Sequence, residues 1–298
     1  MPSKELQGDA RKVRPTAKNN VLNWLGVLPF FLFALAFLIL PTVSIFVSTF
    51  QDAAGHFTFQ NIRDLFSPYI LNAYGLSIKV SLFTAVIGSL FGFLLAYSVT
   101  LGGLPKGVQT FLNTFSGVAS NFAGVPLSFA FISTLGRVGL VTVLLQQFLG
   151  ISLYDMGFNL YSFSGLCLVY LYFQFPLMVL LITPSLQGLK REWREASENL
   201  GATNWQYWRY IGFPILLPSL LASTVLLFGN AFGAYATAYA LTGGSLNLVP
   251  IMIGAEIRGD ILHNVGLGYA LAFGMVVIMG VTIFAYNLLQ RKSARWLQ

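Results

Sequence analysis

The stretch Glu195-Ala196-Ser197-Glu198-Asn199-Leu200-Gly201, with Ile211-Gly212-Phe213-Pro214 shortly after it, is a polar insert between long apolar segments. From Lys190 to Tyr210 the chain mixes charged side chains with Trp and Tyr, a composition that a span buried in lipid does not tolerate. The insert must therefore lie in water or against another protein, and the apolar segments on either side of it must cross a membrane.

The composition of the whole chain supports this interpretation. Of 298 residues, 56% are apolar and only 9% are charged, whereas soluble domains carry about 25% charged residues. A hydrocarbon core of about 30 Å requires about 20 apolar residues per helix. We therefore expect an all-α integral membrane protein. Its six transmembrane helices are expected near residues 25–48, 75–100, 111–135, 160–186, 214–242 and 266–289.

A signal peptide is the alternative interpretation of the first apolar run. The run is longer than the apolar core of a typical signal peptide, and no small-x-small cleavage site precedes the next polar stretch. We expect it to be retained as the first transmembrane helix.

The basic residues predict the orientation of the chain in the membrane. Most of the 17 Lys and Arg residues fall on one side of the expected spans: Lys4, Arg11, Lys12, Arg14, Lys18, Lys106, Lys190, Arg191, Arg194, Arg209, Arg291, Lys292 and Arg295. Because cytoplasmic loops are enriched in Lys and Arg, we expect a multi-pass protein of the cell inner membrane with both termini cytoplasmic. The net charge of +7 then reflects orientation, and we expect no nucleic-acid partner.

The expected organisation has three parts. Residues 1–22 form a polar cytoplasmic tail, residues 23–290 form the six-helix transmembrane domain with the insert at about 190–212, and residues 291–298 form a second cytoplasmic tail.

Two segments on the opposite side of the membrane are too short or too polar to cross it. In the first, Val141, Leu144, Leu145 and Phe148 repeat at helical spacing and predict a helix at or beyond the outer membrane surface. The second, residues 249–253, is apolar and predicts a re-entrant loop at the mouth of a pathway, with a surface cap as the alternative.

Within the insert, the sequence predicts two short helices joined by a sharp turn. A first helix over residues 192–200 would end at Gly201, which supplies the left-handed backbone that a helix C-terminus commonly requires. Thr203 or Asn204 would cap a second helix beginning near Trp205, and Pro214 would begin the fifth span. Such a rigid unit can transmit force. The alternative is an amphipathic helix anchored by its aromatic residues at the lipid headgroups.

The motif, the six spans and the expected cytoplasmic termini together resemble permeases of the type I ABC importers, such as those that serve spermidine and putrescine. Ser197 in place of a second Ala and Phe213 in place of Leu depart from the family pattern. The resemblance implies the type I permease fold, with a cytoplasmic coupling helix that docks on an ATPase. The coupling residues it implies are Glu195, Ala196, Ser197, Gly201, Ala202, Ile211 and Pro214.

The resemblance also implies partners for the chain. These are two ABC ATPase subunits that bind ATP and Mg, a second permease that is homologous or identical, an extracytoplasmic solute-binding protein, a small-molecule solute and the lipid bilayer. The function implied is a permease subunit that forms the translocation pathway of an ATP-driven importer.

The sequence contains no motif for catalysis in this chain. It has no Gly-x-x-x-x-Gly-Lys-Ser/Thr phosphate loop, no His-Glu-x-x-His metal motif and no Gly-x-Ser-x-Gly elbow, and its lone Cys167 lies in an apolar run. We expect a non-catalytic subunit without a cofactor or metal of its own. A gradient-driven secondary carrier or channel is the main alternative, but the intramembrane charges that ion coupling uses are scarce. A membrane-embedded enzyme would need a reactive cluster.

Polar side chains within the apolar runs are candidates for the lining of a pathway. These are Asn121, Gln174, Asn230 and Tyr235. Uncharged hydrogen-bonding groups let a solute pass without trapping it, and hydrogen bonding between helices is the alternative role for each of them. A polyamine would favour an acidic lining, yet none of the 10 acidic residues lies in the middle of an expected span, so the solute stays open.

Overall fold

The computed structural model describes residues 17–52, 54–258 and 264–294. Apart from an isolated bridge between Gln51 and Phe57, the regular structure of these residues is entirely helical. The helices, with η for π-helical segments, are α1 (Ala17–Ala34), η1 (Leu35–Ile39), α2 (Leu40–Thr49), α3 (Gln60–Asp64), α4 (Pro68–Leu101), α5 (Lys106–Asn121), α6 (Gly124–Leu135), α7 (Leu140–Leu149), α8 (Phe163–Gln187), α9 (Arg191–Asn199), α10 (Asn204–Tyr207), η2 (Trp208–Gly212), α11 (Phe213–Phe232), α12 (Tyr235–Thr242), α13 (Val249–Arg258) and α14 (Val265–Ala294).

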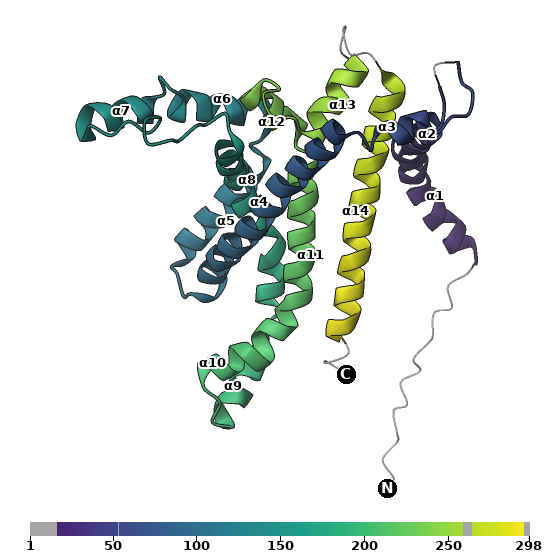
Figure 1. Ribbon diagram of the computed structural model, residues 1–298. Helices are drawn as coiled ribbons and strands as arrows, with labels where there is room; N and C mark the ends of the chain where they lie inside the picture. The colour runs from purple at the N-terminus through teal and green to yellow at the C-terminus, as the bar shows by residue number, and fades with distance from the viewer. Residues whose placement is uncertain (1–16, 53, 259–263, 295–298) are drawn as a thin grey trace.

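The fold class is confirmed. Six segments of the described residues are long and apolar enough to cross a membrane: Gly26–Thr49, Pro68–Leu101, Gly124–Leu149, Phe163–Gln187, Asn204–Phe232 and Val265–Gln290. Figure 1 shows α4, α5, α8, α11 and α14 running between the two ends of the molecule, with α9 and α10 at one end. The other end, where α3, α6, α7, α12 and α13 gather, is called the distal end.

The core lies where α4 packs against α8 and α11. Two glycines of α4 let the backbones approach: a Cβ at Gly92 would lie 2.5 Å from Met178 Cβ, and one at Gly88 would lie 2.9 Å from Gln174 Cβ. Because lipid supplies no hydrophobic force between helices, close packing through small residues holds a membrane bundle together. The small residues of α4 therefore position the helix that precedes the insert, α8, and the helix that follows it, α11.

The third expected span, residues 111–135, is wrong as a single helix. α5 ends at Asn121, Ala123 is extended, and α6 begins at Gly124 with φ +75°. Figure 1 shows α5 beside α4 and α8, while α6 and α7 lie across the distal end. The apolar run continues through the break, so hydropathy alone predicts one helix where the backbone turns.

The fifth expected span, residues 214–242, is also interrupted. α11 ends at Phe232, and Ala234 has φ −76° and ψ 67°, which is not helical. α12 then packs against α6. Near this turn, the N–H of Gly124 donates to Thr237 Oγ1, and the hydroxyls of Ser128 and Tyr170 donate to the carbonyls of Thr237 and Ala234. These bonds from α6 and α8 let the chain leave the helix at membrane depth.

Both predicted distal segments form helices. α7 confirms the helical spacing of Val141, Leu144, Leu145 and Phe148. The expected loop at residues 249–253 is instead the start of α13, which packs against α12, α14 and α4. The N–H of Val249 donates to Ser77 Oγ at 2.9 Å, which ties the first turn of α13 to α4.

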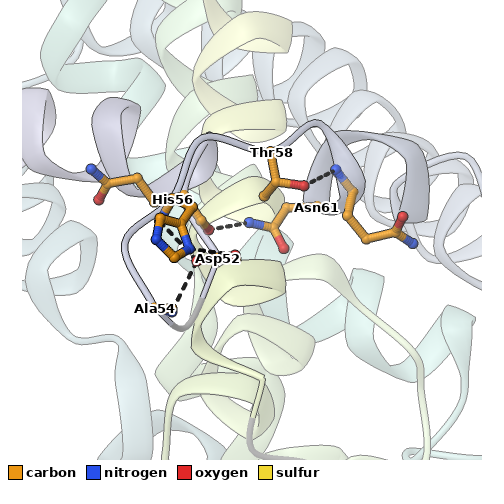
Figure 2. Close-up of polar contacts among 7 residues, drawn as sticks. Asp52, Ala54, His56, Thr58 and Asn61 are labelled. Carbon is orange, nitrogen blue, oxygen red and sulfur yellow. Dashed lines mark hydrogen bonds and ion pairs between the residues drawn. The ribbon is translucent and has the colours of Figure 1, made fainter.

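A short hairpin joins α2 to α3 at the distal end (Figure 2). Asp52 Oδ1 accepts hydrogen bonds from the backbone N–H groups of Ala54 and His56, each at 2.9 Å. The bond from the backbone of His56 is the main cause that holds the pKa of the Asp52 carboxyl below its ordinary value. Asn61 Nδ2 donates to the Thr49 carbonyl at 3.0 Å. These bonds fix how the chain leaves α2.

α1, η1 and α2 form an arm beside the rest of the molecule (Figure 1). The arm packs through α2 on α14, where the Phe46 and Phe273 rings meet edge to face at 4.5 Å. The start of α1 and the end of α14 point towards the end of the molecule that carries α9 and α10 (Figure 1). The tail expected at 1–22 lies largely outside the described residues; α1 begins within it at Ala17, and α14 extends to Ala294 in the second expected tail.

Candidate functional site

α9 carries the charged part of the insert. Arg191 Nε donates to Glu195 Oε1 at 2.8 Å, and Arg194 Nε donates to Glu198 Oε1 at 3.0 Å, one helical turn apart in each case. Exposed pairs of this kind contribute only about 0.3–0.5 kcal/mol each. Ser197 faces the other way: it is buried, and its Oγ donates to the Arg194 carbonyl at 2.7 Å. The helix therefore presents charge on one side and packs on the other.

The turn after α9 has the geometry that the sequence predicts. Gly201 has φ +78°, and its N–H donates to the Glu198 carbonyl at 2.9 Å. The N–H of Ala202 donates to the Ser197 carbonyl at 3.0 Å. This left-handed glycine satisfies the last carbonyls of α9 and reverses the chain.

Thr203 caps α10. Its Oγ1 accepts from the N–H of Gln206 at 3.3 Å, while Gln206 Oε1 accepts from the N–H of Thr203 at 2.7 Å. This reciprocal arrangement is a capping box, and it confirms the cap predicted at this position. α10 runs directly into η2 and then α11, with Pro214 in the first turn of α11. α10, η2 and α11 thus form one continuous rod, and the turn at Gly201 and Ala202 joins α9 to it.

An apolar groove of about 400 Å³ lies between α9 and the start of α11. The sequence predicted four of its lining residues, Ala196, Ser197, Ala202 and Ile211. Leu200 stands at the groove with 88% of its surface exposed, which a soluble surface disfavours without a partner. The groove and the ion-paired charges beside it suit a docked protein surface.

The remaining predicted coupling residues lie outside the apolar groove. Glu195 lies on the charged side, where it lines a second cavity of about 550 Å³ with Arg191 and Arg194. Gly201 forms the turn, and Pro214 begins α11. The motif residues therefore lie at the groove, at the turn after α9 and at the start of α11, and they do not form one contact surface.

Sequence reasoning missed the apolar residues that complete the groove. They are Trp193, Leu200, Tyr207, Tyr210 and Ile215. Together with the predicted Ala196 and Ile211 they fall three or four residues apart, at 193, 196 and 200 along α9 and at 207, 211 and 215 along α10 into α11. This spacing is the pattern that indicates one face of a helix.

Of the predicted pathway residues, Gln174 is fully buried between helices. Its Nε2 donates to Thr84 Oγ1 at 3.3 Å and to the Leu227 carbonyl at 3.2 Å, which links α8 to α4 and α11. Its Oε1 has no hydrogen-bond partner among the described residues. This position favours the interhelical role; a pathway role for Gln174 stays a prediction.

Asn121, Asn230 and Tyr235 gather at the two helix breaks. Asn121 ends α5 and is exposed, Asn230 is exposed in the last turn of α11, and Tyr235 begins α12 half-buried. The breaks are joined directly, because the N–H of Gly124 donates to Thr237 Oγ1 at 2.8 Å. The breaks thus place three polar side chains from distant parts of the sequence at one level of the bundle.

Thr237, which was not among the predicted site residues, joins the two helix breaks. Its carbonyl accepts from Ser128 Oγ at 2.8 Å, so Thr237 bonds α6 through both its side chain and its backbone. Tyr170 adds a bond from its hydroxyl to the Ala234 carbonyl at 2.9 Å.

Among the described residues, no group of three or more His, Cys, Asp or Glu side chains is arranged to hold a metal ion. Cys167 is buried in α8. The expectation of a chain without a cofactor of its own stays a prediction.

Comparison with known proteins gives consistent results. The model of the family described as "binding-protein-dependent transport system inner membrane component" matches residues 88–295, which include the whole insert. A probable sulfate transport system permease protein of Nephroselmis olivacea is 24% identical over 288 residues, 92% of this chain and 95% of that protein. The ferric transport system permease protein FbpB of Actinobacillus pleuropneumoniae is 27% identical over 255 residues, 83% of this chain but only 35% of that longer protein.

Solved structures share the fold. The crystal structure of a bacterial ABC transporter involved in the import of the acidic polysaccharide alginate aligns with a TM-score of 0.73 at 17% identity, over 92% of this chain and 96% of the other. An inward-facing structure of the MetNI methionine ABC transporter aligns with a TM-score of 0.50 at 16% identity, over 76% of this chain and 99% of the other.

Proposed function

The chain belongs to the family of binding-protein-dependent transport system inner membrane components and is a permease subunit of an ABC importer, and on that premise we propose that α9 and α10 couple it to separate ATPase subunits. The chain is a multi-pass membrane protein and not the catalytic subunit. The family membership replaces the alternative of a gradient-driven carrier.

The observation that carries the proposal is the continuity of the insert with α11. The groove beside Ala196 and Leu200 offers an apolar contact surface to a partner, and the ion-paired side chains of α9 offer a charged one. The capping box at Thr203 starts α10, so no flexible loop separates it from α11. A partner that moves α9 therefore moves α11 as well. Because α11 ends at the break beside Asn230 and Tyr235, the same movement reaches the proposed pathway.

The proposed partners are two ABC ATPase subunits that bind ATP and Mg, a second permease and an extracytoplasmic solute-binding protein. Support comes from the family description, which names a binding protein, and from a solved alginate transporter described in complex with its periplasmic protein. The second permease is proposed because Asn121 and Asn230 are exposed at membrane depth in the single chain, where polar groups need protein or water.

The proposed orientation places α9, α10 and the ends of α1 and α14 on the cytoplasmic side of the inner membrane. The basic residues of the loops support it, and α1 and α14 both point to the end that carries α9 (Figure 1).

For the solute we propose a small inorganic ion. The relatives reported above are named for sulfate and ferric transport, and neither name supports a polyamine. The six membrane segments also contain no Asp or Glu, so a polycation would meet no opposite charge there. Asn121, Gln174, Asn230 and Tyr235 remain the proposed pathway residues, with the weakest case for the buried Gln174.

The test compares two glutamates of α9 in the reconstituted importer. Glu195 and Glu198 are matched, because both side chains are about half exposed, at 55% and 58%, and both pair with an arginine one turn away. We expect Glu195→Ala to abolish solute uptake and the stimulation of ATP hydrolysis by the loaded binding protein, while Glu198→Ala retains most of both. Equal stimulation in the two variants would contradict the coupling role of the motif residue.

A further inference from the structure

A second apolar cleft lies beside α10, η2 and the start of α11, on the side away from the apolar groove that Ala196 and Leu200 line. It has a volume of about 660 Å³ and runs between α4 and the segment α10–η2–α11. Phe93 and Leu94 of α4 and Phe213 of α11 form its apolar walls. None of the residues that line this cleft lines the apolar groove. A partner docked in the apolar groove would therefore leave this cleft uncovered.

Aromatic side chains define the mouth of the cleft. The Trp208 ring packs edge to face on Tyr97 at 5.2 Å, and Trp205 stands beside them with 72% of its surface exposed. Gly212 makes this possible, since a Cβ there would lie 2.7 Å from the Trp208 ring. Trp and Tyr with an apolar body and a polar edge are the side chains that occupy the headgroup level of a bilayer. The cleft thus opens where the apolar part of α4 approaches the end of the molecule that carries α9.

Arg209 supplies an unpaired positive charge at the cleft. Among the described residues no carboxylate lies within ion-pair distance of it, and Glu195 and Glu198 of the insert pair with Arg191 and Arg194. Its guanidinium lies over the Tyr210 ring at 5.6 Å. A guanidinium beside an apolar cleft fits a ligand that has an anionic head and an apolar tail.

We propose that this cleft binds an anionic phospholipid from the leaflet on the side of α9, with an acyl chain along Phe93 and Leu94 and the phosphate on Arg209. Trp205 and Trp208 each carry an indole N–H, a hydrogen-bond donor that the oxygen atoms of a lipid headgroup can accept from. The lipid would contact η2, the segment that joins the proposed coupling unit to α11. This site does not depend on the identity of the solute or of the ATPase.

The test uses the tryptophans of the cleft as reporters. The full chain, with Trp24, Trp193 and Trp296 changed to Phe, is reconstituted in phosphatidylcholine vesicles that contain either dibrominated phosphatidylglycerol or dibrominated phosphatidylcholine. Bromine quenches indole fluorescence at short range. One cation near the membrane surface favours an anionic lipid by about fivefold. We therefore expect half-maximal quenching at about one fifth as much brominated phosphatidylglycerol as brominated phosphatidylcholine.

Two variants of that chain decide the role of Arg209. Arg209→Gln is expected to remove the preference for the anionic lipid, whereas Lys106→Gln, which removes a cation at the first residue of α5 outside the cleft, is expected to keep it. Equal quenching by the two lipids, quenching by neither, or a preference that survives Arg209→Gln would overturn the proposal. The comparison of the two lipids is made on the chain with Arg209 and Lys106 unchanged, so it still tests the proposal if a variant fails to fold.

Discussion

At the scale of single residues, Gly201 and Gly212 are required for different physical reasons. Gly201 has φ +78°, and a Cβ there would meet nothing within 4 Å, so the constraint is one of backbone conformation. Gly212 is buried in η2, and there the constraint is space, because a Cβ would lie 2.7 Å from the Trp208 ring. Alanine at Gly201 tests the backbone constraint, and alanine at Gly212 tests the constraint of space.

Gly201→Ala is expected to strain the turn between α9 and α10. A left-handed backbone costs an L-residue about 1–2 kcal/mol, which the capped turn relieves by shifting α9. We expect lower coupling, measured as uptake per ATP hydrolysed, with normal insertion in the membrane. Gly107→Ala is the control, since Gly107 also has open space around it but lies in α5 without a positive φ. Equal coupling in both variants would mean that the turn geometry is unimportant.

Gly212→Ala is expected to push the Trp208 ring away from Tyr97. The clash is with a rigid indole, and overpacking of this kind costs about 1–3 kcal/mol. We expect a changed tryptophan emission and weaker quenching by brominated phosphatidylglycerol in the vesicle assay. An unchanged emission spectrum would show that Trp208 is free to move aside.

Gln174→Met tests whether Gln174 acts between helices or in the pathway. The substitution removes two long hydrogen bonds and also the buried Oε1 that has no partner among the described residues. Interhelical hydrogen bonds in membranes contribute about 0.6 kcal/mol on average, so we expect a small change in thermal stability and near-normal uptake. Uptake that is lost while stability is kept would place Gln174 in the pathway after all.

At the scale of elements, hydropathy predicted where the chain is apolar but not where its helices turn. The runs at 111–135 and 214–242 are continuous in composition, yet both break, at Ala123 and at Ala234. Each break is stabilised by bonds from residues far away in the chain, such as Thr237 to Gly124. Such partners are invisible in a single sequence.

The insert was predictable because its structure is local. Gly201 and the capping box at Thr203 each satisfy backbone groups within a few residues, so the sequence around them suffices. The groove was predicted only in part, because which faces of α9 and of the start of α11 meet depends on how the two helices pack.

Thr237→Val tests the bond between the two breaks. The valine has the same shape, but it leaves the N–H of Gly124 without its acceptor. The loss costs about 1–3 kcal/mol for a fully buried donor and less for this part-buried one. We expect a lower unfolding temperature of the purified protein. Thr242→Val is the control: Thr242 is buried in the same helix, and its hydroxyl bonds only to the carbonyl of Ala238. Equal destabilisation by both changes would rule out a special role for the junction.

At the scale of the whole molecule, the proposed coupling unit and α7 lie at opposite ends (Figure 1). Their separation across the bundle makes the orientation testable with the single cysteine, since Cys167 is 3% exposed and its replacement by alanine gives a chain without thiols. Leu200, 88% exposed, marks one end, and Val138, 91% exposed, marks the other.

We expect Val138→Cys to react with a membrane-impermeant maleimide on spheroplasts, and Leu200→Cys to react only after the membrane is opened. Both variants carry Cys167→Ala and are expressed without the proposed partners, so that the groove is uncovered. The reverse pattern of labelling would invert the proposed topology.

The arm of α1, η1 and α2 has an evolutionary consequence. The most apolar stretch within its residues 26–49 has no residue buried inside the molecule, and the arm packs through α2 on α14. An ancestor without the arm would have kept the junction of α4, α8 and α11 intact, exposing in addition only the surface of α14 around Phe273 and the hairpin that follows α2. In evolutionary terms, the arm can therefore change with little effect on the junction of α4, α8 and α11, because its main contact with the rest of the described chain is that of α2 on α14.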